Sequence, residues 1–155
     1  MNIFRRLADR IIGLADRRPP DFVIGEPGAP YLLRWWLIPR NRVFNIYLHC
    51  ILRSDDDRAL HDHPWVNISL LLRGVYLEHT DSRILLHVAG DIVARRATMA
   101  HRLQLVDERT AWSLFITGPT VRTWGFWCPQ RWRSWKIFTA HAEDGHSGRV
   151  GRGCD

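Results

Sequence analysis

The sequence predicts one mainly β domain of the barrel or sandwich type, preceded by a single amphipathic helix. Its 155 residues are enough for one domain with a sizeable core. Residues 2–18 repeat apolar side chains at helical spacing, whereas short apolar runs divided by turn residues follow Pro20. The last residues are polar and rich in glycine. We therefore expect an N-terminal helix in residues 1–20, a β-barrel in 21–142 and a flexible polar tail in 143–155.

The helix is predicted from four apolar residues spaced four apart, Ile3, Leu7, Ile11 and Ala15. Several arginines supply its polar surface, and Pro19-Pro20 ends it. A basic amphipathic helix can lie on anionic lipid. We favour the alternative, in which the apolar stripe packs against the domain or against a partner subunit.

The remainder of the chain reads as a series of short strands. Arg73-Gly74 and Thr80-Asp81-Ser82 have the composition of turns between neighbouring strands. The expected strands are Phe22–Gly25, Tyr31–Ile38, Val43–Arg53, Val66–Arg73, Val75–His79, Ile84–Val88, Asp91–Ala94, His101–Val106, Trp112–Thr117, Thr123–Trp127 and Trp135–Ala140. Short strands at this spacing are typical of all-β sandwiches and barrels.

Charge and hydropathy exclude several classes of partner. The formal net charge is +6, but the basic residues are spread along the whole chain without a long basic run. We therefore expect no nucleic-acid partner, although arginines near a pocket could hold an anionic substrate. No apolar run approaches the length of a transmembrane helix, so no stable membrane insertion is expected. A small-molecule substrate or ligand is the expected partner.

The cysteines predict reduced thiols. Cys50, Cys128 and Cys154 form neither an even set nor a CxxC motif. The first residues are interrupted by charges and show no secretory signal. We therefore expect three free thiols and a cytoplasmic location.

Three histidines form the candidate metal site. His61 and His63 are two positions apart on a predicted extended segment, where side chains alternate, so both imidazoles point to one face and Asp62 points away. His101 follows His63 by 38 positions. Imidazoles that converge can bind Fe, Zn, Ni or Cu. The alternative is that these histidines pair only with backbone groups or water.

The spacing around these histidines resembles the two sequence motifs of the cupin superfamily. In the first motif His61 and His63 match the histidine pair, and Gly74 matches its closing glycine. In the second motif Gly90 matches the first glycine and His101 matches the histidine in register. The resemblance covers roughly residues 43 to 118. It implies an all-β, cupin-type double-stranded β-helix, or jelly-roll barrel, behind the N-terminal amphipathic helix.

Several motif positions depart from the family pattern. Asp55 replaces a glycine, Asn67 replaces the usual glutamate, Leu105 replaces an asparagine, and Arg96-Ala97-Thr98 replaces Pro-x-Gly. The run His-Asp-His-Pro-Trp and the later Trp-Gly-Phe-Trp-Cys-Pro are also similar to a group of bacterial and phage cupin-like proteins that have no settled function.

The resemblance implies that His61, His63 and His101 bind one divalent transition metal. Because Asn67 replaces the carboxylate, the site keeps three neutral ligands and resembles the three-histidine iron arrangement of the cupin thiol dioxygenases. Fe(II) is therefore favoured, with Zn, Ni, Cu or Mn as alternatives. Cupins that resemble this chain are often dimers, so a homodimer is expected.

Seven other residues are candidates for hydrogen-bonding the metal ligands or lining the pocket. Glu78 could reach the site only if its strand turns that side chain inward. His49 is expected to be a hydrogen-bonded structural histidine. His79 and His87 lie beside turns and are expected to be in solvent. The seven candidates are Asn67, Tyr47, His49, Tyr76, Glu78, Arg102 and Arg122.

The favoured function is metal-dependent oxygenase chemistry on a small molecule, although a fold alone does not fix a reaction. One alternative is a cupin-type isomerase or lyase that acts on a sugar or an acid and needs a positioned acid or base. The other is a non-enzymatic ligand-binding or assembly protein.

Overall fold

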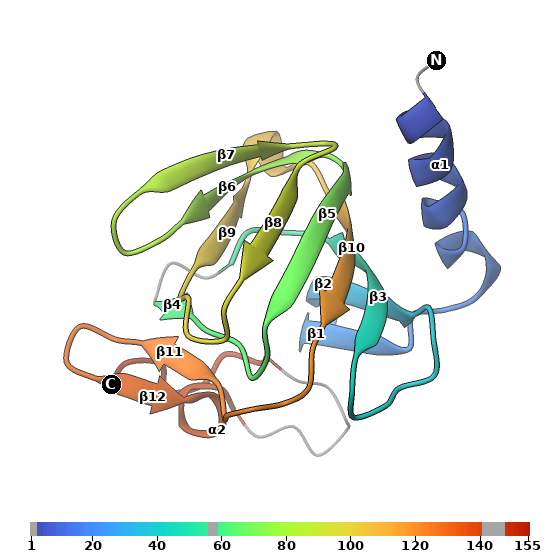
Figure 1. The fold of residues 1–155 in the computed structure, drawn as a ribbon. Coiled ribbons are helices and arrows are strands. Elements are labelled where there is room, and N and C mark those ends of the chain that lie inside the picture. The colour runs from blue at the N-terminus through green and yellow to red at the C-terminus, as the bar shows by residue number, and fades with distance from the viewer. Residues whose placement is uncertain (1–2, 56–58, 141–147) are drawn as a thin grey trace.

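The computed structural model describes residues 3–55, 59–140 and 148–155. The strands form three antiparallel sheets (Figure 1). Side chains from all three sheets line a cavity. The largest sheet has the strand order β1-β2-β3-β10-β5-β8, and two three-stranded sheets have the orders β7-β6-β9 and β12-β11-β4. Strands distant in sequence thus become neighbours, as when β10 lies between β3 and β5.

The strands agree closely with the predicted runs, with three differences. Val75–His79 and Ile84–Val88 are strands with the predicted bounds. The predicted strand Trp135–Ala140 is wrong, because Trp135–Phe138 forms the short helix α2. Two short strands, β4 at Leu60–His61 and β12 at Trp132–Ser134, were not among the predicted strands. The elements are α1 Ile3–Ile12, β1 Phe22–Glu26, β2 Ala29–Trp36, β3 Asn45–Ile51, β4 Leu60–His61, β5 Asn67–Arg73, β6 Val75–His79, β7 Ile84–Val88, β8 Ile92–Arg95, β9 Arg102–Leu105, β10 Ala111–Thr117, β11 Gly125–Trp127, β12 Trp132–Ser134 and α2 Trp135–Phe138, with 3-10 turns at Ala15–Arg17 and Val106–Glu108.

The helix α1 is shorter than predicted and packs through its C-terminal half. Gly13 follows its last residue, and Ala8 and Ile12 are buried against the outer face of the large sheet, beside Trp35 and Leu48. Ile3 is 83% exposed, and Figure 1 shows the start of the helix standing away from the sheets. Only part of the predicted apolar stripe therefore contacts the domain. Neither helix among the described residues is long and apolar enough to cross a membrane.

The inner face of the large sheet carries a second core and the cavity wall. Leu32, Ile51, Leu71 and Ala111 are buried on this face and pack with Tyr76 of β6. Apolar side chains on both faces stabilise the sheet because each face is removed from water. The inner core lies at one end of the face, which leaves the remaining inward positions for polar and aromatic side chains.

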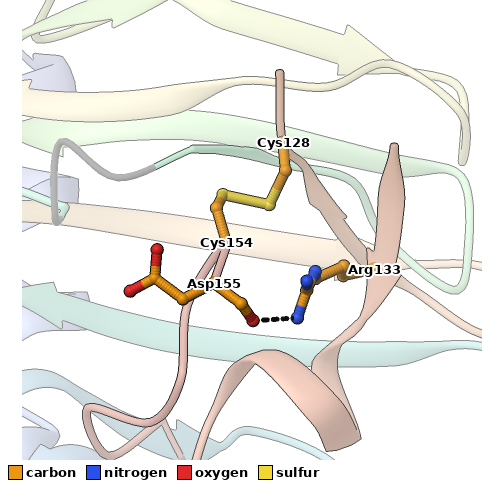
Figure 2. Close-up of a disulfide and its surroundings, with 4 residues drawn as sticks. All are labelled: Cys128, Arg133, Cys154 and Asp155. Carbon is orange, nitrogen blue, oxygen red and sulfur yellow. Dashed lines mark hydrogen bonds between the residues drawn. A yellow bond between two sulfur atoms is a disulfide. The ribbon is translucent and has the colours of Figure 1, made fainter. Parts of the chain in front are cut away.

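The C-terminal segment is joined to the β11–β12 hairpin by a disulfide between Cys128 and Cys154 (Figure 2). The prediction of free thiols is therefore wrong for this pair, while Cys50 is free and buried. The flexible tail was expected over residues 143–155. From Gly148 onward, however, the segment pairs with the body of the protein through the bridge Thr139–Val150. Residues 141–147 lie outside the described residues.

Candidate metal centre

The structure brings His61, His63 and His101 together, as the sequence predicts. His61 ends β4, and its backbone forms two 2.9 Å hydrogen bonds with that of His101, just before β9. One ring nitrogen of each histidine lies within 4.8 Å of the others. The Nε2 atoms of His63 and His101 are 2.9 Å apart. Two segments separated by about 40 residues therefore aim three imidazoles at one point.

Asp62 points away from the three imidazoles and fixes the segment that carries two of them. Its side chain is fully buried, and it accepts hydrogen bonds from the backbone N–H of Gly125 and from the indole N–H groups of Trp127 and Trp132, at 2.8 to 3.1 Å. Arg122 forms an ion pair with the same carboxylate at 2.7 Å. Asp62 therefore anchors the β11–β12 hairpin behind the histidines, and Arg122 has a structural role outside the cavity.

Glu78 lies on the far side of His101 and orients its ring. Its Oε1 atom is 2.7 Å from His101 Nδ1 and 2.6 Å from Arg95 Nε, and its Oε2 atom is 2.9 Å from His87 Nε2. The strand β6 therefore faces inward at Glu78. A carboxylate on Nδ1 leaves Nε2 directed toward the other histidines, which is the usual arrangement behind a metal-ligating histidine. The expectation that His87 lies in solvent is wrong, because its ring contacts Glu78 and is mostly buried.

The charges of this cluster suit a cationic metal. Burial opposes ionisation of Glu78, but hydrogen bonds from His101 and Arg95 and the charge of Arg95 outweigh it and hold the pKa of Glu78 well below its usual range. Burial lowers the pKa of His101 to about 4, although Glu78 opposes this shift. Burial, followed by the charges of His101 and His61, lowers the pKa of His63 well below its usual range. Neutral imidazoles are the form that binds metals.

Asn67 does not join the three histidines in lining the cavity. Its side chain is buried at the start of β5, where its backbone is in register with Thr117 and Arg95, and it lies outside the set of cavity residues. The substitution of asparagine for the family glutamate therefore leaves a donor set of three imidazoles. This set fits a divalent transition metal such as Fe(II) or Zn(II).

The histidine cluster opens onto a cavity of about 510 Å³. Aromatic side chains form much of its wall: Phe22, Trp65, Phe115, Trp124 and Phe126. Trp65 stacks on His63 with ring centroids 5.0 Å apart. An aromatic, largely apolar wall with a few polar groups is typical of a small-molecule site.

The other predicted pocket residues divide into those inside and those outside the cavity. Tyr76 and His49 line it. His49 is buried and accepts a hydrogen bond from Arg34, which agrees with its predicted structural role. Tyr47 instead borders a second cavity of about 370 Å³, and Arg102 contacts His79.

Sequence reasoning missed several cavity residues that come from other strands. Arg34 and Tyr31 lie on β2, Arg95 ends β8, and Asp55 precedes β4 with its Oδ2 atom 3.8 Å from His61 Nδ1. Asp55 is also held in place, because its carboxylate accepts a hydrogen bond from Leu103 N–H at 2.6 Å. Alternation along β2 could have placed Arg34 on one face, but only the sheet order shows which face is inward.

Comparison with solved structures identifies the architecture. A cupin-2 domain from Rhodospirillum rubrum superposes with a TM-score of 0.58 and 12% identity over 71% of this chain and 76% of that one. The chain has the cupin fold. A cupin-like protein from Thermotoga maritima gives a TM-score of 0.55 and 12% identity over 72% of this chain and 86% of that one. A Klebsiella pneumoniae protein with a double-stranded β-helix domain gives a TM-score of 0.52 and 14% identity over 65% of this chain and 88% of that one.

The cupin likeness extends to fold alone. The identities of 12% to 14% are too low to carry an activity from one protein to the other. No family model and no curated protein matches the sequence. What this protein does must therefore be inferred from its own cavity and side chains.

Proposed function

We propose that His61, His63 and His101 bind one divalent transition metal, with Fe(II) favoured, and that the protein carries out oxygenase-type chemistry on a small molecule in the adjoining cavity. The observation that carries the proposal is the convergence of three largely buried imidazoles with a carboxylate behind one of them. Bound Fe(II) would supply redox chemistry with dioxygen, and Zn, Ni, Cu or Mn are the alternatives.

The residues around the histidines have distinct tasks in this proposal. Glu78 holds the ring of His101 in one orientation, and Asp62 holds the segment that carries His61 and His63. Trp65 and Phe115 pack against His63 and exclude water from that side of the cavity. Exclusion of water strengthens every electrostatic interaction with a bound molecule and protects reactive species.

Oxygen uptake by metal-loaded protein tests this function. Metal-free protein is loaded anaerobically with Fe(II), Zn(II) or Mn(II) and then mixed with aerated buffer and a panel of small carboxylic acids. We expect oxygen consumption that depends on one of these compounds, occurs only with Fe(II) and disappears in His63→Ala. The variant His79→Ala is the matched control, because His79 lies outside the cavity and contacts Gln104. Turnover of a compound without oxygen use would contradict the oxygenase assignment.

A lyase or isomerase is the second candidate, and one observation favours it. Tyr31 and Asp55 both line the cavity, and Asp55 Oδ2 lies 3.8 Å from His61 Nδ1. Burial, followed by the charge of Asp55 and a hydrogen bond to it, raises the pKa of Tyr31 well above its usual value. A buried hydroxyl beside a carboxylate is a candidate proton donor. This function would tolerate Zn or Mn, need no oxygen and fail in Tyr31→Phe.

A non-enzymatic ligand-binding or assembly role is the third candidate, and it predicts that ligand affinity survives in His63→Ala. The homodimer, the absence of a nucleic-acid partner and the cytoplasmic location all stay predictions. The disulfide removes one support for the cytoplasmic location, since it had been inferred partly from unpaired cysteines.

A further inference from the structure

A row of polar side chains crosses the inner face of the large sheet away from the histidine cluster. Arg34 of β2 is in register with His49 of β3, which is in register with Ser113 of β10. Registered residues of antiparallel strands point to the same face. All three side chains line the cavity. The metal-ligand proposal uses none of them.

The Arg34 guanidinium is held in place from several sides. Its Nε donates a hydrogen bond to His49 Nε2 at 2.8 Å. Its Cζ atom lies 4.8 Å from the ring centroid of Tyr47 and 6.0 Å from that of Phe22. These contacts occupy Nε and the ring-facing surface of the group. Within the described part of the chain, its two terminal nitrogens form no hydrogen bond or ion pair.

The charge of Arg34 is not compensated in the way that the charge of Arg95, a buried arginine of the same cavity wall, is compensated. Arg95 is paired with Glu78 at 2.6 Å. No carboxylate among the described residues forms an ion pair with Arg34. Burial lowers the pKa of Arg34 to about 10, so the group remains a cation at neutral pH. A partly desolvated cation without a counterion gains most from binding an anion.

We infer that Arg34 binds the carboxylate of the small molecule that this cavity takes, through its two terminal nitrogens. The inference rests on the proposed function only in that it names the substrate class for the same cavity. The two terminal N–H groups of the guanidinium form a planar, parallel pair of donors that matches the planar geometry of a carboxylate. Phe115 lies between this subsite and the histidines, with ring centroids 4.8 Å from His49 and 6.1 Å from His63.

The position of Phe115 indicates what kind of body the ligand has. A carboxylate on Arg34 would place the rest of the molecule against Phe115 and Trp65, whose rings are 5.7 Å apart, and then toward His63. The ligand class is therefore a small carboxylic acid with an apolar or aromatic body, whose end distant from the carboxylate reaches the histidine cluster.

Binding of benzoate to metal-free protein tests the inference without any contribution from a metal. Affinities for benzoate and for uncharged benzamide are measured by calorimetry with the wild type, Arg34→Gln and Arg34→Lys. Arg73→Gln is the matched control, because it removes the same charge from an arginine that pairs with Asp9 on the outer face. We expect benzoate to bind Arg34→Gln roughly 10- to 100-fold more weakly, the range for a lost charge-assisted hydrogen bond. The benzoate affinity of Arg34→Lys should lie between those of the wild type and Arg34→Gln. Arg73→Gln should bind benzoate as the wild type does, and the affinity for benzamide should be the same in every variant.

The result that would overturn the inference is equal benzoate affinity in wild type and in an Arg34→Gln variant whose circular dichroism spectrum and melting temperature show that it is folded. If that variant does not fold, unchanged affinity in Arg34→Lys overturns it instead. The inference is also overturned if the wild type binds none of benzoate, 3-phenylpropionate and acetate at millimolar concentration. It is overturned likewise if the wild type binds inorganic phosphate more tightly than these carboxylates. The His61→Ala/His63→Ala variant should retain the Arg34 effect, so failure of the metal site and failure of this subsite are distinguishable.

Discussion

Replacing Asp62 with asparagine should destabilise the protein strongly although the two side chains have nearly the same shape. The carboxylate accepts hydrogen bonds from Gly125 N–H and two indole N–H groups and pairs with Arg122, all while fully buried. An amide would direct its own N–H groups at these donors and would leave Arg122 without its charge partner. Removing one member of a buried ion pair lowers the free energy of unfolding by about 3–5 kcal/mol. The lost hydrogen bonds are included in this range, because their contributions do not add to that of the ion pair.

Urea and thermal denaturation measure this effect. For a domain of this size the expected loss lowers the melting temperature by roughly 10 °C. Asp81→Asn is the matched control, because Asp81 is an exposed acid in the β6–β7 turn. The control should change the free energy of unfolding by less than about 0.5 kcal/mol. A loss below about 1 kcal/mol in Asp62→Asn would refute the view that this carboxylate anchors the β11–β12 hairpin.

Three further predictions concern the cysteines, Glu78 and Gly125. Burial raises the pKa of Cys50 to about 11, so no thiol of the native protein should react rapidly with a thiol reagent at pH 8. One thiol should react after unfolding and three after reduction and unfolding. Three reactive thiols without reduction would contradict the disulfide. Glu78→Gln should weaken Zn(II) binding about 10- to 100-fold in calorimetry, because the carboxylate orients His101, and unchanged affinity would contradict that role. Gly125→Ala should lower the free energy of unfolding by about 1–3 kcal/mol, since its Cβ would lie 2.0 Å from the carbonyl oxygen of Arg133; equal stability in urea would contradict this close approach.

The predicted convergence of the three histidines agrees with the structure because it depends on strand alternation and on motif spacing. Alternation places His61 and His63 on one face and Asp62 on the other, and the motif spacing brings His101 beside them. Gly74 illustrates the same point. Its φ of 96° and the 2.8 Å separation between a hypothetical Cβ and Ala111 Cα explain why the closing position of the motif requires glycine.

The rest of the site could not be predicted because it depends on how the sheets are stacked. Glu78 and Arg34 each lie on a predicted strand, but only the sheet order decides which face of each strand meets the cavity. The Cys128–Cys154 pair is separated by 26 residues and meets only because the C-terminal segment returns to the β11–β12 hairpin. Trp135–Phe138 has the composition of a strand but forms a helix directly after β12, so tertiary context overrides its β propensity.

Metal content is the most direct test of the central claim that three histidines form a metal centre. Untagged protein purified without added metal is assayed by elemental analysis beside His61→Ala/His63→Ala and the control His79→Ala. We predict about one iron, zinc, nickel, copper or manganese per chain in the wild type and the control, and almost none in the double variant. Little metal in every protein, together with no uptake when Fe(II) or Zn(II) is supplied, would contradict the metal centre.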